Sequence, residues 1–322
     1  MKLLNEFYAF MRERETIRLR RRAGLPRDRW TDDPILKTFS FTNVKREHDR
    51  TTVGLLPLYR DHLWIHAERS PETMRALMIN CALYRYFGTV EMARAIGWVP
   101  EWTEEQSSRI QQLADDRMLL GETVFTSAYI VPNCGSTLPK HVIVCQIMGE
   151  LWNALPEIMQ YGSWKRMCDR MCEVWGVGPF MAKEVLLDYI LASGDKPNDW
   201  DTWTPCGPGG KRGASRVAYG AIENVTPDEA LGIIREIYAV CADHWRHELF
   251  DQSVVGNFAI ETLDLTDIQF QLCEFDKYSR VAEGRKPKRN FRPTLDVVTM
   301  GRCDPTDACA THGRCWTHST ED

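Results

Sequence analysis

The sequence lacks any run of about 18 uncharged apolar residues, which is the length that a membrane-crossing helix requires. Its first residues include an acid at Glu6 and an arginine at Arg12, and they lack the apolar core and the small-residue cleavage site of a secretory signal. We therefore expect neither a membrane span nor secretion. The 11 cysteines are odd in number and scattered, which favours reduced thiols over a disulfide framework.

Strand-like stretches are also few, and signals for helices dominate. The strand candidates are Thr51–Tyr59, Thr123–Val131 and His141–Cys145. Residues 3–23 follow a helical period and stop at Gly24, and N-terminal capping signals occur at Ser70, Thr103 and Thr226. With 43% hydrophobic residues, the 322-residue chain can bury a core as one large domain or two medium ones. The sequence predicts a mainly α protein with a small β element.

The net charge of −5 argues weakly against a nucleic-acid partner, but the charge is unevenly distributed. Residues 10–29 carry eight arginines against three acids, and residues 277–292 carry seven basic groups against one acid. Two basic stripes on an otherwise acidic chain are typical of a protein that binds a phosphate backbone. Solvated helix faces with paired charges are the alternative for the first stripe. Within the second stripe, the predicted DNA contacts are Arg285, Lys286, Lys288 and Arg289.

Residues 164–192 contain the clearest local motif, a predicted helical hairpin. A helical run ends near Trp175, a tight turn follows at Gly176 and Gly178, and Pro179 opens a second helix. Free N–H groups at the start of a helix can bind a phosphate, so both glycines are candidate DNA contacts. An ordinary corner between two helices is the alternative. The segment resembles the helix-hairpin-helix of DNA glycosylases, which holds one DNA phosphate without reading sequence.

The glycosylase resemblance also points to Asp201, which is followed by a threonine and lies 23 residues after Gly178. That superfamily places its catalytic aspartate in this region, whereas a helix N-cap is the structural alternative. Members with lyase activity carry a Schiff-base lysine two residues after the second glycine of the hairpin. Phe180 occupies that position here, so strand cleavage is not expected.

The glycine-rich segment Gly207–Gly213 contains Lys211 and Arg212. It does not match a nucleotide-binding P-loop, because neither serine nor threonine follows the lysine. Successive backbone N–H groups in such a turn can form a concave site for phosphate, and a flexible surface loop is the alternative.

An ordered set of segments extends the resemblance beyond the general glycosylase pattern. The set comprises Trp30–Leu36, Phe41–Arg50, Ser127–Val131, Gly176–Phe180, Asp201–Gly209 and Cys273–Tyr278. Over about residues 5–292 the chain resembles the phage α-glutamyl/putrescinyl thymine pyrophosphorylases, or amino acid:DNA transferases. The same helical module occurs fused in 5-hydroxymethyluracil DNA kinases. Because this sequence contains no nucleotide-binding kinase motif, the resemblance implies a stand-alone transferase.

In this family, the enzyme replaces the phosphate or pyrophosphate of phosphorylated 5-hydroxymethyluracil in double-stranded DNA with an amine. The amine comes from an amino acid such as glycine, or from a polyamine, and a 5-hydroxymethyluracil DNA kinase prepares the substrate. The resemblance therefore implies a DNA-modifying enzyme in the cytoplasm of the infected bacterium, where the product shields phage DNA from host restriction. The reaction requires no cofactor.

This chemistry needs an extruded base, a deprotonated amine, a neutralised leaving group and the exclusion of water. The candidate catalytic residues are Asp201, as the base or as the carboxylate that holds the ammonium, and Glu274, Asp276 and Lys277 on a helix that opens near Thr266. The candidate phosphate and substrate ligands are Lys45, Arg46, Glu47, Asp49, Arg50, Tyr129, Lys211 and Arg212. A surface ladder of ion pairs is the alternative for residues 45–50, and an ordinary core aromatic is the alternative for Tyr129.

We expect residues 1–292 to form the transferase domain and residues 293–322 to form a separate tail. The tail contains Cys309, His312, Cys315 and His318 at a close spacing that suits a tetrahedral structural zinc site. A disordered tail with incidental cysteines is the alternative. The two histidines fit an iron–sulfur cluster poorly.

Two other functions remain compatible with the sequence. A monofunctional DNA glycosylase would use the same hairpin and Asp201 but would leave an abasic site. A non-catalytic subunit of a phage modification complex would need only the DNA-binding surface, and the clustered charges at residues 45–50 and 274–277 favour a reactive site over such a subunit.

Overall fold

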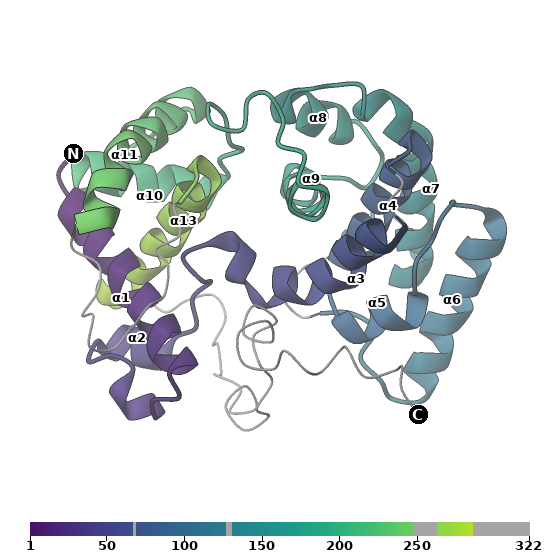
Figure 1. Cartoon of the computed structure of the whole chain (residues 1–322), viewed down its shortest axis with the longest axis horizontal. Helices are drawn as coiled ribbons and strands as arrows, with labels where there is room; N and C mark the ends of the chain where they lie inside the picture. Colours follow the sequence, from purple (N-terminus) through teal and green to yellow (C-terminus); the bar gives the residue numbers. More distant parts are fainter. Residues whose placement is uncertain (67–68, 127–130, 248–262, 286–322) are drawn as a thin grey trace. The chain divides into compact units, whose positions relative to one another are not determined.

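The computed structural model describes residues 1–66, 69–126, 131–247 and 263–285, and within these ranges it contains helices and no strand. The predicted mainly α fold is thus confirmed. The chain divides into two compact units (Figure 1). Unit 1 consists of residues 1–49 and 206–322, and unit 2 is the continuous segment 50–205. The predicted boundary between domain and tail, at residue 292, lies outside the described residues.

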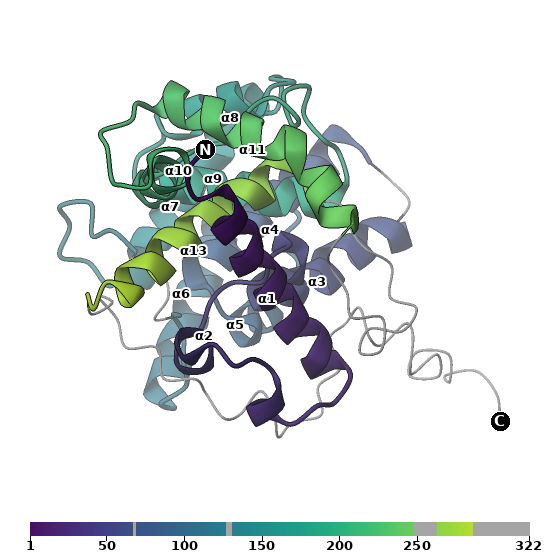
Figure 2. The same cartoon turned by 90° about the vertical axis from the view of Figure 1, so that its left-hand side faces the viewer.

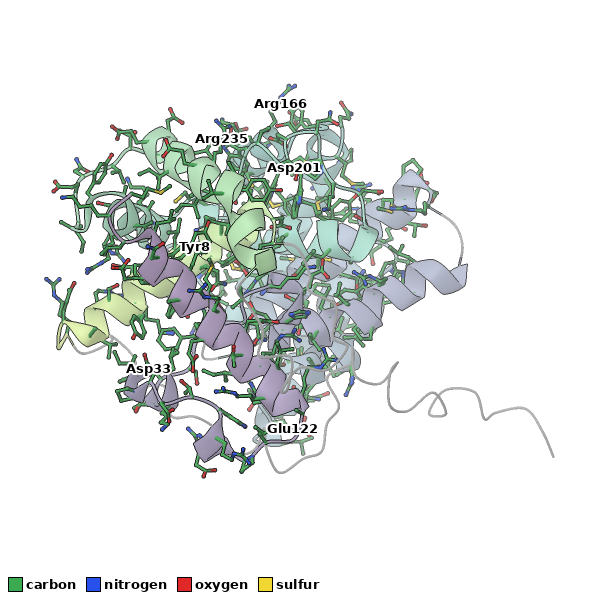
Figure 3. The ribbon with its side chains drawn as sticks, turned by 60° about the vertical axis from the view of Figure 1, so that its left-hand side comes forward. Tyr8, Asp33, Glu122, Arg166, Asp201 and Arg235 are labelled. Atoms are coloured by element: carbon green, nitrogen blue, oxygen red, sulfur yellow. The ribbon has the colours of Figure 1, made fainter. Side chains whose placement is uncertain are left out.

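Unit 1 is organised around the close packing of two helices. Its helices are α1 (Leu4–Arg22), α2 (Pro34–Thr38), α10 (Pro208–Tyr219), α11 (Pro227–His247) and α13 (Leu265–Ala282), with short 3-10 helices η1 (Arg27–Arg29) and η2 (Arg46–His48). The α10 and α13 helices form the most extensive contact, and α1 crosses α13 (Figure 2). The Phe7 and Phe10 rings of α1 both lie 5.5 Å from the Phe275 ring. Tyr8 reaches α11, where its hydroxyl donates to the Ile237 carbonyl at 2.8 Å (Figure 3).

Unit 2 contains the remaining helices. They are α3 (Arg50–His66), α4 (Pro71–Phe87), α5 (Val90–Ile96), α6 (Glu104–Leu119), α7 (Lys140–Ile158), α8 (Trp164–Met171) and α9 (Pro179–Ser193). The α4 and α9 helices are buried on nearly all sides, which marks them as the centre of this unit. Buried charges join them, because Arg85 of α4 donates to both carboxylate oxygens of Asp188 and lies 3.2 Å from Glu184. None of the described helices is long and apolar enough to cross a membrane.

The helix starts that the sequence predicts are confirmed. The hydroxyl oxygens of Ser70 and Thr103 accept bonds from backbone N–H groups in the first turns of α4 and α6. At the start of α11, Thr226 and Glu229 cap each other reciprocally. These starts are readable from sequence because a cap depends only on neighbouring residues.

The strand predictions for residues 51–59 and 141–145 are wrong, because these segments lie in α3 and α7. In α3, Leu55, Tyr59 and Leu63 are buried at intervals of four residues, so the segment has a helical face despite its β-branched residues. The 141–145 segment begins a helix whose apolar side continues through Ile147 and Leu151. In the third candidate, residues 123–126 and 131 form no strand, and residues 127–130 lie outside the described residues.

Candidate functional site

The predicted hairpin is a pair of helices, α8 and α9, joined by a turn at the surface of unit 2. The first helix ends at Met171, one turn earlier than predicted, and the chain reverses through Gly176 with φ of +79°. A Cβ at Gly176 would lie 2.5 Å from Ile147 Cγ1, so only glycine fits there. On either side of the turn, Trp175 and Phe180 are 42% and 53% exposed. The bend is therefore accessible to a partner molecule.

Gly178 is the N-cap of α9, and no side chain in the described part of the chain caps this helix. Pro179 occupies the first helical position, as predicted. Because the first turn of a helix presents backbone N–H groups and the positive end of its dipole, this terminus has the geometry for a phosphate. DNA binding by Gly176 and Gly178 stays a prediction.

Asp201 lies in the exposed loop between α9 and α10 (Figure 3). Neither a hydrogen bond nor an ion pair from the described residues engages its carboxylate, and it caps no helix. Asp199 instead supports the start of α8, whose N-cap is Ser163; it accepts bonds from Ser163 Oγ and from the backbone N–H groups of Trp164 and Lys165. Asp201 therefore remains a candidate catalytic carboxylate in unit 2.

The glycine-rich segment that the sequence assigns to a loop is helical and forms the start of α10. A Cβ at Gly213 would lie 1.9 Å from the Leu272 carbonyl oxygen, and one at Gly209 would lie 2.3 Å from Cys273 Sγ. These glycines let α10 approach α13 closely. Both the phosphate-cradling turn and the flexible loop are therefore wrong for residues 207–213.

Two further predicted site residues, Arg212 and Asp276, belong to this helix contact. Asp276 is fully buried on α13, and its carboxylate oxygens accept from Arg212 Nε at 2.9 Å and Arg216 Nε at 3.1 Å. Arg280 Nε lies 3.3 Å from the same carboxylate. The charge of Asp276 is thus neutralised inside the unit, where it joins α10 to α13, and its predicted catalytic role stays a prediction. Arg212 is engaged in the same way, and Lys211 beside it is half-buried.

The predicted 45–50 cluster is also partly committed to internal contacts. Arg46 is buried, forms an ion pair with Asp49 and stacks its guanidinium 4.5 Å from the Phe270 ring centroid. Burial raises the pKa of Asp49, and the Arg46 charge and the bond from the Asn43 N–H oppose this rise. Arg46 and Asp49 thus pair with each other inside the unit, and their predicted role as ligands stays a prediction. Lys45 and Glu47 are half-buried, and exposed Arg50 begins α3 in unit 2.

Glu274 and Lys277, both on α13, contact the segment Ser40–Thr42. Glu274 Oε2 accepts from the Thr42 N–H at 3.2 Å and from Lys277 Nζ at 3.4 Å. Lys277 Nζ also donates to the Ser40 carbonyl at 2.6 Å and lies 4.5 Å from the centroid of the Phe41 ring. A carboxylate and an ammonium group therefore sit side by side, each only partly exposed.

Residues 40–43 also line a pocket of about 700 Å³ in unit 1. The charged residues of its described lining are mostly basic; they are Arg14, Arg18, Arg21, Arg27 and Lys37. One acid, Asp28, lies in the same lining. Aromatic rings contribute the apolar walls; they are Trp30, Phe39 and Phe41. Sequence reasoning placed the arginines in a basic stripe but did not find the pocket, because the spacing of residues along α1 does not reveal which side chains are covered.

Some predicted residues lie outside the described residues. These are Tyr129, Lys286, Lys288, Arg289, Cys309, His312, Cys315 and His318. Arg285 is described, is exposed and lies 3.6 Å from Glu283. Across the described ranges, no group of three or more metal-ligating side chains occurs.

Comparison with known proteins gives the family. The model of the helical domain of 5-hmdU DNA kinase matches residues 1–287. A protein of Bacillus phage SP10 named 5-hmdU DNA kinase is 28% identical over 324 residues, which cover 92% of this chain and 49% of the relative. The chain thus spans about half the length of the curated relative that it matches, and no solved structure matches it. The chain belongs to the family defined by the helical domain of 5-hmdU DNA kinases.

Proposed function

We propose that this chain is a transferase of phage thymine hypermodification that acts on phosphorylated 5-hydroxymethyluracil in double-stranded DNA. It replaces the phosphate or pyrophosphate on the exocyclic methylene with an amine from an amino acid or a polyamine. The observation that carries the proposal is the contact of Glu274 and Lys277 with Ser40–Thr42, at the wall of a cationic pocket. Membership in a family named for a 5-hmdU kinase supports the choice of modified base.

The reaction breaks the bond between the methylene carbon and the phosphate oxygen and forms a carbon–nitrogen bond. The ammonium form of the amine first gives a proton to a general base, for which Asp201 is the candidate tested below. The free amine then attacks the methylene carbon, and the leaving group departs with the two electrons of the broken bond as phosphate or pyrophosphate. Glu274 supplies a carboxylate that can hold the ammonium, and Lys277 supplies a cation for the departing phosphate. Partial burial of both groups strengthens these interactions and limits the access of water.

DNA binding is assigned to surfaces outside that cluster. The exposed α8–α9 bend presents the N-terminus of α9 at Gly178 to a backbone phosphate. The basic residues between Arg285 and Arg292 add positive charge. A 5-hydroxymethyluracil DNA kinase supplies the phosphorylated base, and no cofactor takes part in the exchange. The site of action is the cytoplasm of the infected bacterium, where the modified DNA resists host restriction.

The test incubates the protein with duplex DNA that carries 5-phosphomethyluracil, in parallel with its pyrophosphorylated form. Each DNA is offered glycine, serine, glutamate or putrescine, and the product is digested to nucleosides and analysed by mass spectrometry. A nucleoside whose mass has lost the phosphate and gained one amine is the expected result. An unchanged nucleoside with every amine and both leaving groups would refute the transferase.

A monofunctional DNA glycosylase is the second candidate, and one observation favours it. The helical hairpin is followed by Asp201, whose carboxylate is exposed and has no partner among the described residues. In the same assay, this function would release the free base and leave an abasic site in the absence of any amine.

Asp201 is also a candidate base for the transferase, and a matched pair of variants tests it. Asp201→Asn keeps the size of the side chain and removes its charge, so we expect DNA affinity to be retained and turnover to fall by about 100-fold or more. Asp116→Asn, on the exposed face of α6, is the control and should keep full turnover. Full activity of Asp201→Asn would remove Asp201 from the chemistry.

A further inference from the structure

Arg14 differs from the other buried arginines that the structure describes. Arg46, Arg85 and Arg216 each form an ion pair with a buried aspartate. Arg14 is only 6% exposed, yet no carboxylate of the described residues lies within ion-pairing distance of it. A buried charge without a counter-ion is costly, so this guanidinium is a candidate for an external anion.

The neighbours of Arg14 hold it without neutralising it. Its Nη1 donates to Gln271 Oε1, its Nη2 lies 3.5 Å from Thr42 Oγ1, and its guanidinium lies 4.7 Å from the Phe10 ring centroid. Its Nε is buried and has no hydrogen-bond partner among the residues that the structure describes. Burial lowers the pKa of Arg14 to about 10, an effect that the Glu274 charge partly offsets. The guanidinium is thus fixed in orientation, and one donor remains unsatisfied.

This side chain lines the pocket of about 700 Å³ described above. That volume far exceeds the needs of an inorganic anion or a small amino acid, and it lies in the range of about 300–1,000 Å³ typical of sites for drug-sized ligands. The described lining also contains four more basic side chains and one acid, Asp28. Two of the four, Arg18 and Lys37, form ion pairs with Glu15 and Asp32 outside that lining, and the remaining basic charge favours an anionic ligand. The aromatic walls provide surfaces on which a planar base can stack.

We propose that this pocket receives an extruded pyrimidine nucleotide whose base bears a phosphate group, with Arg14 bonding that phosphate and the aromatic walls holding the ring. This inference rests on the proposed function, because it names the part of the chain in which the phosphorylated base would be bound. Extrusion is required by geometry, since a base inside the duplex cannot enter a pocket of this kind. The contacts of Ser40–Thr42 with Glu274 and Lys277 place the reactive pair next to the pocket lining.

The test measures binding to the full chain by calorimetry. It uses free mononucleotides, whose binding depends neither on contacts with a DNA backbone nor on an amine. The probes are 5-phosphomethyl-dUMP, 5-hydroxymethyl-dUMP and inorganic phosphate, so the base phosphate, the backbone phosphate and the bare anion are separated. We expect 5-phosphomethyl-dUMP to bind most tightly. Arg14→Gln should weaken it by about 10- to 100-fold, the effect of losing hydrogen bonds between charged groups.

Because Arg14 is buried, the exposed pocket variants Arg27→Gln and Lys37→Gln provide a second measurement that does not depend on a core position. We expect each to weaken 5-phosphomethyl-dUMP binding several-fold. Arg94→Gln, on the exposed face of α5 in unit 2, is the charge-matched control and should bind normally. Equal affinity of all these proteins for the probe, or equal affinity of the native chain for the two nucleotides, would overturn the inference.

The outcome is distinguishable from failure of the proposed function. Arg14-dependent binding of 5-phosphomethyl-dUMP without amine transfer would support the pocket and refute the transferase. Amine transfer to DNA with an unchanged KM for phosphorylated DNA in Arg14→Gln, Arg27→Gln and Lys37→Gln would support the transferase and refute the pocket.

Discussion

Glu274 illustrates how a single side chain can be tested without disturbing the fold. Its Oε2 accepts two hydrogen bonds, whereas Oε1 has no partner among the described residues. Oε1 can therefore accept a hydrogen bond from a ligand. Glu274→Gln keeps the size and removes the charge. We expect the KM for the amine to rise by about 10- to 100-fold, because a charge-assisted bond to the ammonium is lost.

Steady-state kinetics with increasing amine at saturating DNA measures this effect. Glu13→Gln on α1 is the matched control, and its KM should equal that of the native chain. A variant at Glu274 with normal KM and normal kcat would show that this carboxylate does not contact the amine.

At this scale the sequence singled out Glu274 and Lys277 as candidates, but it did not reveal the pocket whose lining residues they contact. Glu274 and Lys277 can be recognised in the sequence because they carry opposite charges three residues apart and adjoin one side of an apolar stripe on one helix. Arg14 did not stand out, since it is one of eight arginines in residues 10–29 and only burial distinguishes it from the others. The ion pairs of Asp276 could not be foreseen either, because its arginine partners on α10 lie far away in the sequence.

At the scale of elements, the contact between α10 and α13 is the most extensive in unit 1. Gly213 allows the two helices to approach closely. Gly213→Ala would place a Cβ 1.9 Å from the Leu272 carbonyl oxygen, and backbone atoms of α13 cannot yield without moving the helix. We expect the free energy of unfolding to fall by about 1–3 kcal/mol or more, despite the better helix propensity of alanine. Urea denaturation followed by circular dichroism measures it.

Gly232→Ala on α11 is the control for this prediction, because a Cβ at that position meets no atom within 4 Å. Alanine there should stabilise the chain by about 0.4–1 kcal/mol through the unfolded state and helix propensity. Equal effects of the two substitutions would show that the close approach of α10 to α13 does not limit stability.

Elements were predictable where their signals are local. The caps at Ser70, Thr103 and Thr226 and the glycine turn at Gly176 follow from neighbouring residues, and the structure contains all of them. The two strands that became α3 and α7 could not be settled locally, because a short apolar run fits a buried strand as well as a buried helix. The helical structure of residues 207–213 could not be predicted for a similar reason. Their glycines allow close packing against α13, which is distant in the sequence.

At the scale of the molecule, buried thiols make stability sensitive to alkaline pH. Burial raises the pKa of Cys145 in unit 2 to about 12, and that of Cys241 in unit 1 to about 12. An unfolded thiol loses its proton near pH 8.5, so between about 8.5 and 12 the folded state binds more protons than the unfolded state. The stabilising contribution is therefore complete below about pH 8.5 and decreases as the pH rises, by about 1.4 kcal/mol per pH unit for each thiol.

Denaturant unfolding at several pH values between about 7.5 and 10 tests this directly. Cys145→Ala should give a shallower decrease of unfolding free energy with pH than the native chain, whatever its effect near neutrality, where the thiol is protonated in both states. An identical slope for the two proteins would show that Cys145 is not held protonated in the folded state.

The division into two units leads to a prediction about autonomous folding. Unit 2 is the single continuous segment 50–205, and its central helices, α4 and α9, and its buried Arg85–Asp188 pair all lie within that segment. Because the core of unit 2 is formed and its buried charges are paired within the segment, we expect a fragment of these residues to unfold cooperatively in urea.

The fragment retains the α8–α9 bend, so it should still bind duplex DNA, with an affinity that falls as the salt concentration is raised. It should not bind 5-phosphomethyl-dUMP, because Arg14 belongs to unit 1. A fragment that lacks cooperative unfolding would contradict the autonomy of unit 2, and a folded fragment without affinity for DNA would move the phosphate grip from the bend to the basic segments of unit 1.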